Sequence, residues 1–72
     1  MISFYNWIIQ FRKDQNDLGV VGSFLFTDSN FTNDIDTYEK LHTFLKNNVK
    51  DDTQLRVRIR ASFRQYKEKI QA

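Results

Sequence analysis

The chain has 72 residues, a formal net charge of +2, 40% hydrophobic and 15% aromatic residues, and no cysteine. This length allows one hydrophobic core, and therefore a single domain over residues 1–72, while the aromatic content argues against intrinsic disorder. The absence of cysteine excludes disulfides, thiolate metal sites and a cysteine nucleophile.

Residues 2–13 are expected to form the first helix. Its apolar side chains recur at the spacing of one helical face, and Ser3 precedes them at the position of an N-terminal cap. Arg12 and Lys13 fall in the expected last turn, where positive charge interacts favourably with the helix dipole. The core residues expected from this helix are Phe4, Trp7, Ile8 and Phe11.

A second helix is expected over residues 18–27, capped by Asn16 or Asp17. Two glycines, Gly19 and Gly22, lower its helix propensity, so a buried strand is the competing assignment. A lone strand would have no strand to pair with, which favours the helix. The apolar face of this helix consists of Leu18, Val21, Phe24 and Leu25.

Residues 28–33 have the composition of a loop, with Phe31 as the side chain that anchors it to the core. The third helix is expected to begin near Asp34. Asp36 and Glu39 have the three-residue spacing of a capping box, with aspartate in place of the usual serine or threonine. The inner face of this helix holds Tyr38, Leu41 and Leu45, with Phe44 beside them.

The last helix is expected to begin at residues 51–53, after Asn47 and Asn48 cap the end of the previous one. It has the most regular amphipathic pattern in the chain. Four helices joined by short loops predict an all-α protein, a compact four-helix bundle. The apolar stripe of the last helix consists of Leu55, Ile59, Phe63, Tyr66 and Ile70.

Several motifs resemble those of one family. They are Ser-Phe-Tyr-Asn-Trp-Ile from Ser3, Asp28-x-x-Phe31, Tyr38-x-x-Leu41-x-x-x-Leu45, and Phe63-Arg-Gln-Tyr66. They resemble motifs of the YozE-like proteins, small proteins of low-GC Gram-positive bacteria and their phages. The resemblance implies a four-helix domain similar to the sterile alpha motif (SAM), a fold that serves protein association and, in some members, nucleic-acid binding. Thr32 stands where the family usually has proline, and the last helix carries arginine where the family tends to be acidic.

Charge is distributed unevenly along the chain. Residues 1–52 hold 5 basic and 8 acidic side chains, whereas residues 53–72 hold 6 basic and 1 acidic. Helical spacing places four of these cations on one stripe beside the apolar stripe, and points Arg58 and Lys69 to another side. The four are Arg56, Arg60, Arg64 and Lys67.

This stripe has two interpretations. Arginine donates bidentate hydrogen bonds to phosphate, so the aligned cations predict a surface that binds DNA or RNA. The alternative is a solvated helix face whose charge complements the acidic remainder of the domain. Phe63 and Tyr66 interleave with the cations, but their place on the inner stripe favours core packing over base stacking, and packing is also expected for Tyr5 and Tyr38.

No pattern in the sequence indicates catalysis. His42 is the only histidine and has no ligand spacing around it, so we expect a boundary residue and no metal site. Gly19-x-x-Gly22 lacks the features of a phosphate-binding loop. The acidic pairs are expected to stabilise helix starts; they are Asp14 with Asp17, Asp34 with Asp36, and Asp51 with Asp52. We therefore expect no enzyme activity, no cofactor and no small-molecule substrate.

Two functions remain after these exclusions. The first is nucleic-acid binding through the arginine-rich last helix. The second is association with a protein partner or weak self-association, since an acidic body and a basic end suit a head-to-tail contact. A lipid-binding helix is disfavoured because its apolar side chains are needed in the core. Without a membrane-length apolar run or a secretory leader, the expected location is the cytoplasm, with no membrane contact.

Overall fold

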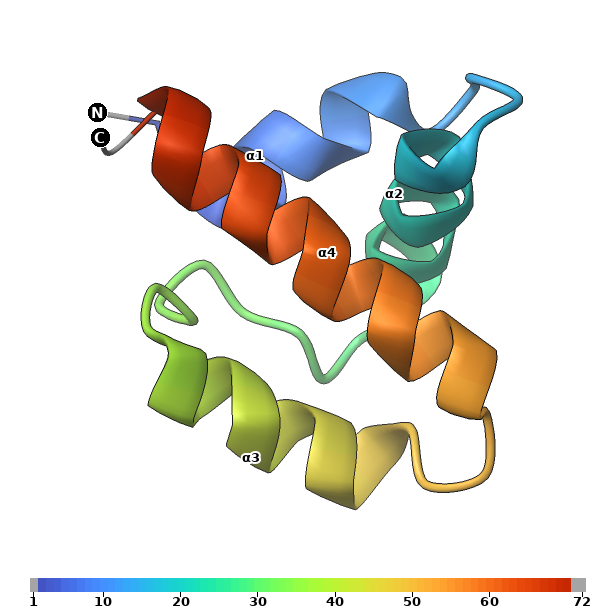
Figure 1. Cartoon of the computed structure of the whole chain (residues 1–72), viewed down its shortest axis with the longest axis vertical. Coiled ribbons are helices and arrows are strands. Elements are labelled where there is room, and N and C mark those ends of the chain that lie inside the picture. Colours follow the sequence, from blue (N-terminus) through green and yellow to red (C-terminus); the bar gives the residue numbers. More distant parts are fainter. Residues whose placement is uncertain (1, 71–72) are drawn as a thin grey trace.

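The structure, a computed structural model, describes residues 2–70. Over these residues it contains helix α1 (Phe4–Ile8), which continues into the 3-10 helix η1 (Ile9–Phe11), then α2 (Asp17–Thr27), α3 (Tyr38–Asn48) and α4 (Thr53–Ile70). Helix α4 runs through the middle of the molecule, with α1 and α2 on one side and α3 on the other (Figure 1). No strand occurs in this part of the chain, so the all-α prediction is confirmed.

Helix α1 begins as the sequence predicts but ends earlier. The Ser3 hydroxyl accepts a hydrogen bond from the backbone N–H of Asn6 at 3.1 Å, which confirms the predicted cap. The α-helical hydrogen bonding stops at Ile8, and the chain tightens into η1 before it turns toward α2. The predicted extension to residue 13 is therefore wrong, and Arg12 lies just after the 3-10 turn, where its side chain donates to the carbonyl of Ile9 at 2.8 Å.

Helix α2 is capped by Asn16, whose side-chain oxygen accepts from the N–H of Gly19 at 2.9 Å. Its two glycines face the backbone of the segment that precedes it. A Cβ atom on Gly19 would lie 1.8 Å from the carbonyl oxygen of Asp14, and one on Gly22 would lie 2.5 Å from that of Ile8. The competing strand assignment is wrong, and the glycines permit a backbone contact that no side chain would allow.

Helix α3 begins later than predicted. Its first residue is Tyr38, and the Thr37 hydroxyl caps it by accepting from the N–H of Lys40 at 3.2 Å. The predicted start near Asp34 and the capping box at Asp36 are therefore wrong. Asp36 forms an ion pair with Lys40 at 3.3 Å instead.

The segment between α2 and α3 explains this late start. Phe31 is buried, as predicted, and so is Ile35, which the sequence analysis did not place in the core. Two core contacts four residues apart hold this segment against the bundle, so the helix begins only after the second of them. Within the segment the Thr32 hydroxyl donates to the Asp34 carboxylate, and this hydrogen bond lowers the pKa of that carboxyl.

The core is built around the Phe4 ring, which lies 5.0 Å from Phe63 and 5.6 Å from Tyr66, centroid to centroid. The Tyr66 hydroxyl donates a hydrogen bond to the carbonyl of Ile2. This bond joins the segment just before α1 to the C-terminal part of α4. Phe11 and Leu55, which were also expected in the core, are only partly buried and pack against its margin. The core side chains are Phe4, Trp7, Ile8, Val21, Leu25, Phe31, Ile35, Leu41, Phe44, Leu45, Val49, Ile59, Phe63 and Tyr66.

Tyr38 was expected in the core and does not lie there. Its side chain is 51% exposed, whereas Leu41 and Leu45 on the same helix are buried. Because α3 begins at Tyr38, no earlier turn of this helix covers the ring. The ring instead contacts the outer side of Phe63, with centroids 5.0 Å apart and planes at 79°. This position places it between α3 and α4.

Candidate functional site

Four cations lie along the side of α4 that borders α3, and we call them the basic row. Their spacing along the helix is four, four and three residues, which places them on one side next to the buried stripe. The row consists of Arg56, Arg60, Arg64 and Lys67. Three of them are partly buried, and Arg64 is exposed.

The two ends of the row have different surroundings. The Lys67 ammonium group donates to the carbonyl of Asp36 and lies 5.3 Å from the centre of the Phe63 ring. The Nε atom of Arg56 is buried without a hydrogen-bond partner, so this side chain contributes packing as well as charge. Arg60 and Arg64, in the middle of the row, are the members best suited to a charge test.

The other two predicted cations lie apart from the row. Arg58 Nε is 3.5 Å from a carboxylate oxygen of Asp17, so it faces α2. Lys69 is exposed, and its helical position is on the same side as Arg58. The structure thus brings together four of the six predicted binding residues and separates these two.

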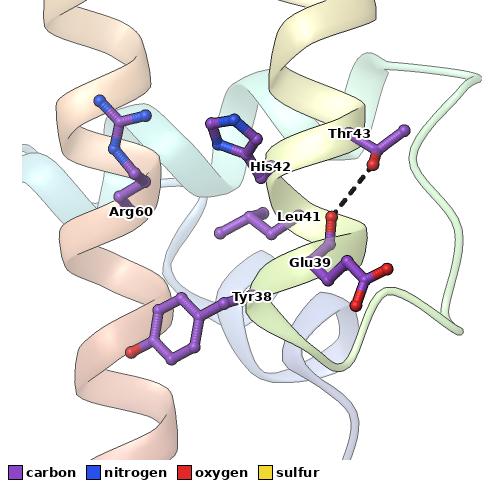
Figure 2. A pocket seen from close by; sticks show the side chains of 6 residues that line it. All are labelled: Tyr38, Glu39, Leu41, His42, Thr43 and Arg60. Carbon is purple, nitrogen blue, oxygen red and sulfur yellow. Dashed lines mark hydrogen bonds between the residues drawn. The ribbon is translucent and has the colours of Figure 1, made fainter.

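A groove of about 400 Å³ runs between α3 and α4 beside the basic row. Figure 2 shows Tyr38 and His42 on α3 pointing toward the space in front of α4, with Arg60 on the opposite side. The Thr43 hydroxyl is already committed to the carbonyl of Glu39 at 3.1 Å. The lining is mostly carbon, so this groove combines an apolar surface with a cationic edge. It is lined by Tyr38, Glu39, Leu41, His42, Thr43 and Arg60.

A second hollow of about 400 Å³ lies where α3 turns into α4. Its lining includes Phe24, Leu55, one cation, Lys50, and two carboxylates, Asp51 and Asp52. Asp52 has the predicted capping role, because its carboxylate accepts from the N–H of Leu55 at 3.0 Å. The negative charge of this hollow makes it a poor site for an anion.

Sequence reasoning found the basic row but missed the groove. The row follows from spacing along a single helix, which the sequence contains directly. The groove depends on how α3 lies against α4, and on the exposure of Tyr38. The burial of Val49 could have been found, because it continues the four-residue spacing of Leu41 and Leu45.

Within residues 2–70, no group of three or more histidine, cysteine, aspartate or glutamate side chains is placed to hold a metal ion. No helix in the same range has the length and apolar character needed to cross a membrane.

Comparison with known families gives one match. A family model described as the YozE SAM-like fold covers residues 3–68, which is most of the chain. The chain belongs to the YozE SAM-like family. Membership agrees with the four-helix architecture and confirms the resemblance found in the sequence motifs. No curated protein and no solved structure matches the chain.

Proposed function

We propose that this YozE SAM-like protein is a non-enzymatic binding module that binds DNA or RNA through the basic row. The observation that carries the proposal is the alignment of Arg56, Arg60, Arg64 and Lys67 beside an open groove. Glu68 is the only acidic side chain on α4. Aligned guanidinium groups suit phosphate because each can donate two hydrogen bonds to one phosphate group.

The charges of the central arginines are available to a ligand. Among residues 2–70, neither Arg60 nor Arg64 takes part in an ion pair, whereas Arg58 on the other side is paired with Asp17. An anion at the row would therefore gain contacts without breaking an internal ion pair at these two positions. This observation favours a binding interface, because the alternative interpretation requires the charge of this helix face to be neutralised within the domain.

The salt dependence of binding tests the proposal. If four cations contact phosphates of a single strand, the slope of log affinity against log salt is about −3. Affinity is then expected to fall roughly 50-fold between about 50 and 200 mM salt. Fluorescence anisotropy with labelled single-stranded and duplex oligonucleotides measures this change. Absence of binding at the lower salt concentration would contradict the proposal.

Association with protein is the second candidate function, and exposed apolar side chains favour it. Val57 on α4 and Val20 on α2 are 53% and 44% exposed, and Phe26 is 50% exposed. In light scattering, self-association through exposed apolar side chains such as Val57 is expected to raise the mean mass with concentration. Val57→Asp should abolish the rise, whereas Gln54→Asp, exposed on the same helix, should not. A constant monomer mass for the unaltered protein would contradict self-association.

A further inference from the structure

We infer that the groove between α3 and α4 binds a base of single-stranded nucleic acid, stacked on Tyr38 while its backbone follows the basic row. This inference rests on the proposed function and specifies the form of nucleic acid. Base stacking requires an exposed ring, and Tyr38 provides one because its side chain is 51% exposed. A groove of about 400 Å³ falls within the usual range of ligand sites, about 300–1,000 Å³.

The Tyr38 ring is held in place before any ligand binds. Its edge-on contact with Phe63, with centroids 5.0 Å apart, fixes one side of the ring against the core. The Thr37 cap fixes the backbone at the first turn of α3. A tyrosine held in this way loses little further rotational freedom on binding, so stacking costs little conformational entropy.

The charges beside the ring match a strand that lies along the groove. Arg60 lines the groove across from His42, and Tyr38 lies further along it, where its ring contacts Phe63 of α4 (Figure 2 shows Arg60, His42 and Tyr38). Arg64 follows Arg60 one turn later on α4. The charged side chains of the lining are Arg60 and Glu39, and the Glu39 carboxylate points away from α4 (Figure 2). A row of cations beside a groove that holds an aromatic ring is the combination that single-strand binding proteins use. In a duplex the base faces are stacked on one another, so a duplex could reach only the cations.

Within residues 2–70, the other surfaces do not offer this combination. The hollow between α3 and α4 near Asp51 and Asp52 carries the wrong charge for phosphate. Phe26 is exposed, but the Arg12 guanidinium lies over its ring at 4.6 Å, which already occupies one face. Two of the exposed large apolar side chains of residues 2–70 are aromatic, Phe26 and Tyr38. Of these two, Tyr38 lines the groove, together with Arg60, which forms no ion pair within these residues.

The test measures anisotropy with labelled oligothymidylate, oligouridylate, oligodeoxyuridylate and a duplex of the same length. Tyr38→Leu retains an apolar contact with Phe63 but removes the aromatic face, and Tyr38→Phe retains the face. Tyr38→Leu is expected to lower single-strand affinity between about 5-fold and 150-fold, whereas Tyr38→Phe should bind as the unaltered protein does. Duplex affinity and the salt slope should remain unchanged in both variants, because no phosphate contact is lost. Oligodeoxyuridylate differs from oligouridylate in the sugar alone, so whichever of these two binds more tightly identifies the preferred sugar.

Two results would overturn the inference. One is equal single-strand affinity of Tyr38→Leu, Tyr38→Phe and the unaltered protein, with Tyr38→Leu shown to be folded by circular dichroism. If salt-dependent binding persists in that case, the proposed function stands and only the stacking inference fails. The other is Tyr38-dependent binding of polyglutamate at least as tight as that of the oligonucleotides, which would assign the groove to an acidic protein segment.

Discussion

Replacing Arg60 and Arg64 together by glutamate is expected to lower the affinity for single-stranded oligonucleotides by roughly 50- to 100-fold at about 50 mM salt. Each cation that neutralises a phosphate releases about 0.7 counterion, which at this salt concentration is worth roughly tenfold in affinity. Both residues lie in the middle of the basic row and neither has an internal ion pair among residues 2–70, so their loss removes contacts with little effect on the fold. Anisotropy titrations at several salt concentrations should also show a shallower salt slope.

The matched control is the pair Lys13→Glu and Lys69→Glu. Both lysines are exposed and lie outside the basic row, and the pair changes the net charge by the same amount. The control separates specific contacts from general attraction between a cationic protein and a polyanion. If both double variants lost affinity equally, the row would not be the interface and the binding would be a property of net charge.

Gly19→Ala is expected to destabilise the fold by about 3 kcal/mol or more. The added Cβ would lie 1.8 Å from the carbonyl oxygen of Asp14 and 2.6 Å from its carbonyl carbon. These are backbone atoms, so no rotation of a side chain relieves the clash, and α2 must move away from the segment before it. Because a domain of this size has a total stability of about 5 kcal/mol, about 2 kcal/mol should remain. The urea midpoint of the variant should then fall by roughly 60%, although only about 3% of the variant is unfolded without urea.

Urea unfolding followed by circular dichroism measures this effect. Ser23→Ala is the control, because Ser23 is exposed on the same helix and its replacement should change stability by less than about 0.5 kcal/mol. Alanine has a higher helix propensity than glycine, so intrinsic propensity alone would make Gly19→Ala stabilising by about 1 kcal/mol. A variant as stable as the unaltered protein would therefore show that the close backbone contact does not exist.

The elements that depend on local sequence were predictable. Ser3 and Asn16 cap their helices because a short polar side chain precedes an apolar helical pattern in each case. The buried stripe of α4 follows from spacing alone, since Ile59, Phe63 and Tyr66 are all buried. The basic row follows from the same spacing.

The start of α3 and the groove depend on tertiary packing and were not predictable. Asp36 and Thr37 are both suitable caps, and the choice between them depends on the burial of Ile35 just before them. Tyr38 has the spacing of a core residue relative to Leu41 and Leu45, yet it lies at the margin where α3 meets Phe63. Gly19 and Gly22 are needed because the backbone of the preceding segment packs against them. Helix propensity depends on local sequence alone, so it could not reveal this contact.

The hydrogen bond from Tyr66 to Ile2 joins residues 64 positions apart, and the Phe4 ring packs between residues of both regions. Helix α4 is synthesised after α1, α2 and α3, so during translation Phe4 and Trp7 emerge from the ribosome before the side chains that will cover them. Contacts so distant in sequence can form only after the loop between them closes, which costs conformational entropy. Until α4 docks, the nascent chain is therefore expected to expose this aromatic surface, which is the kind of surface that chaperones recognise in general.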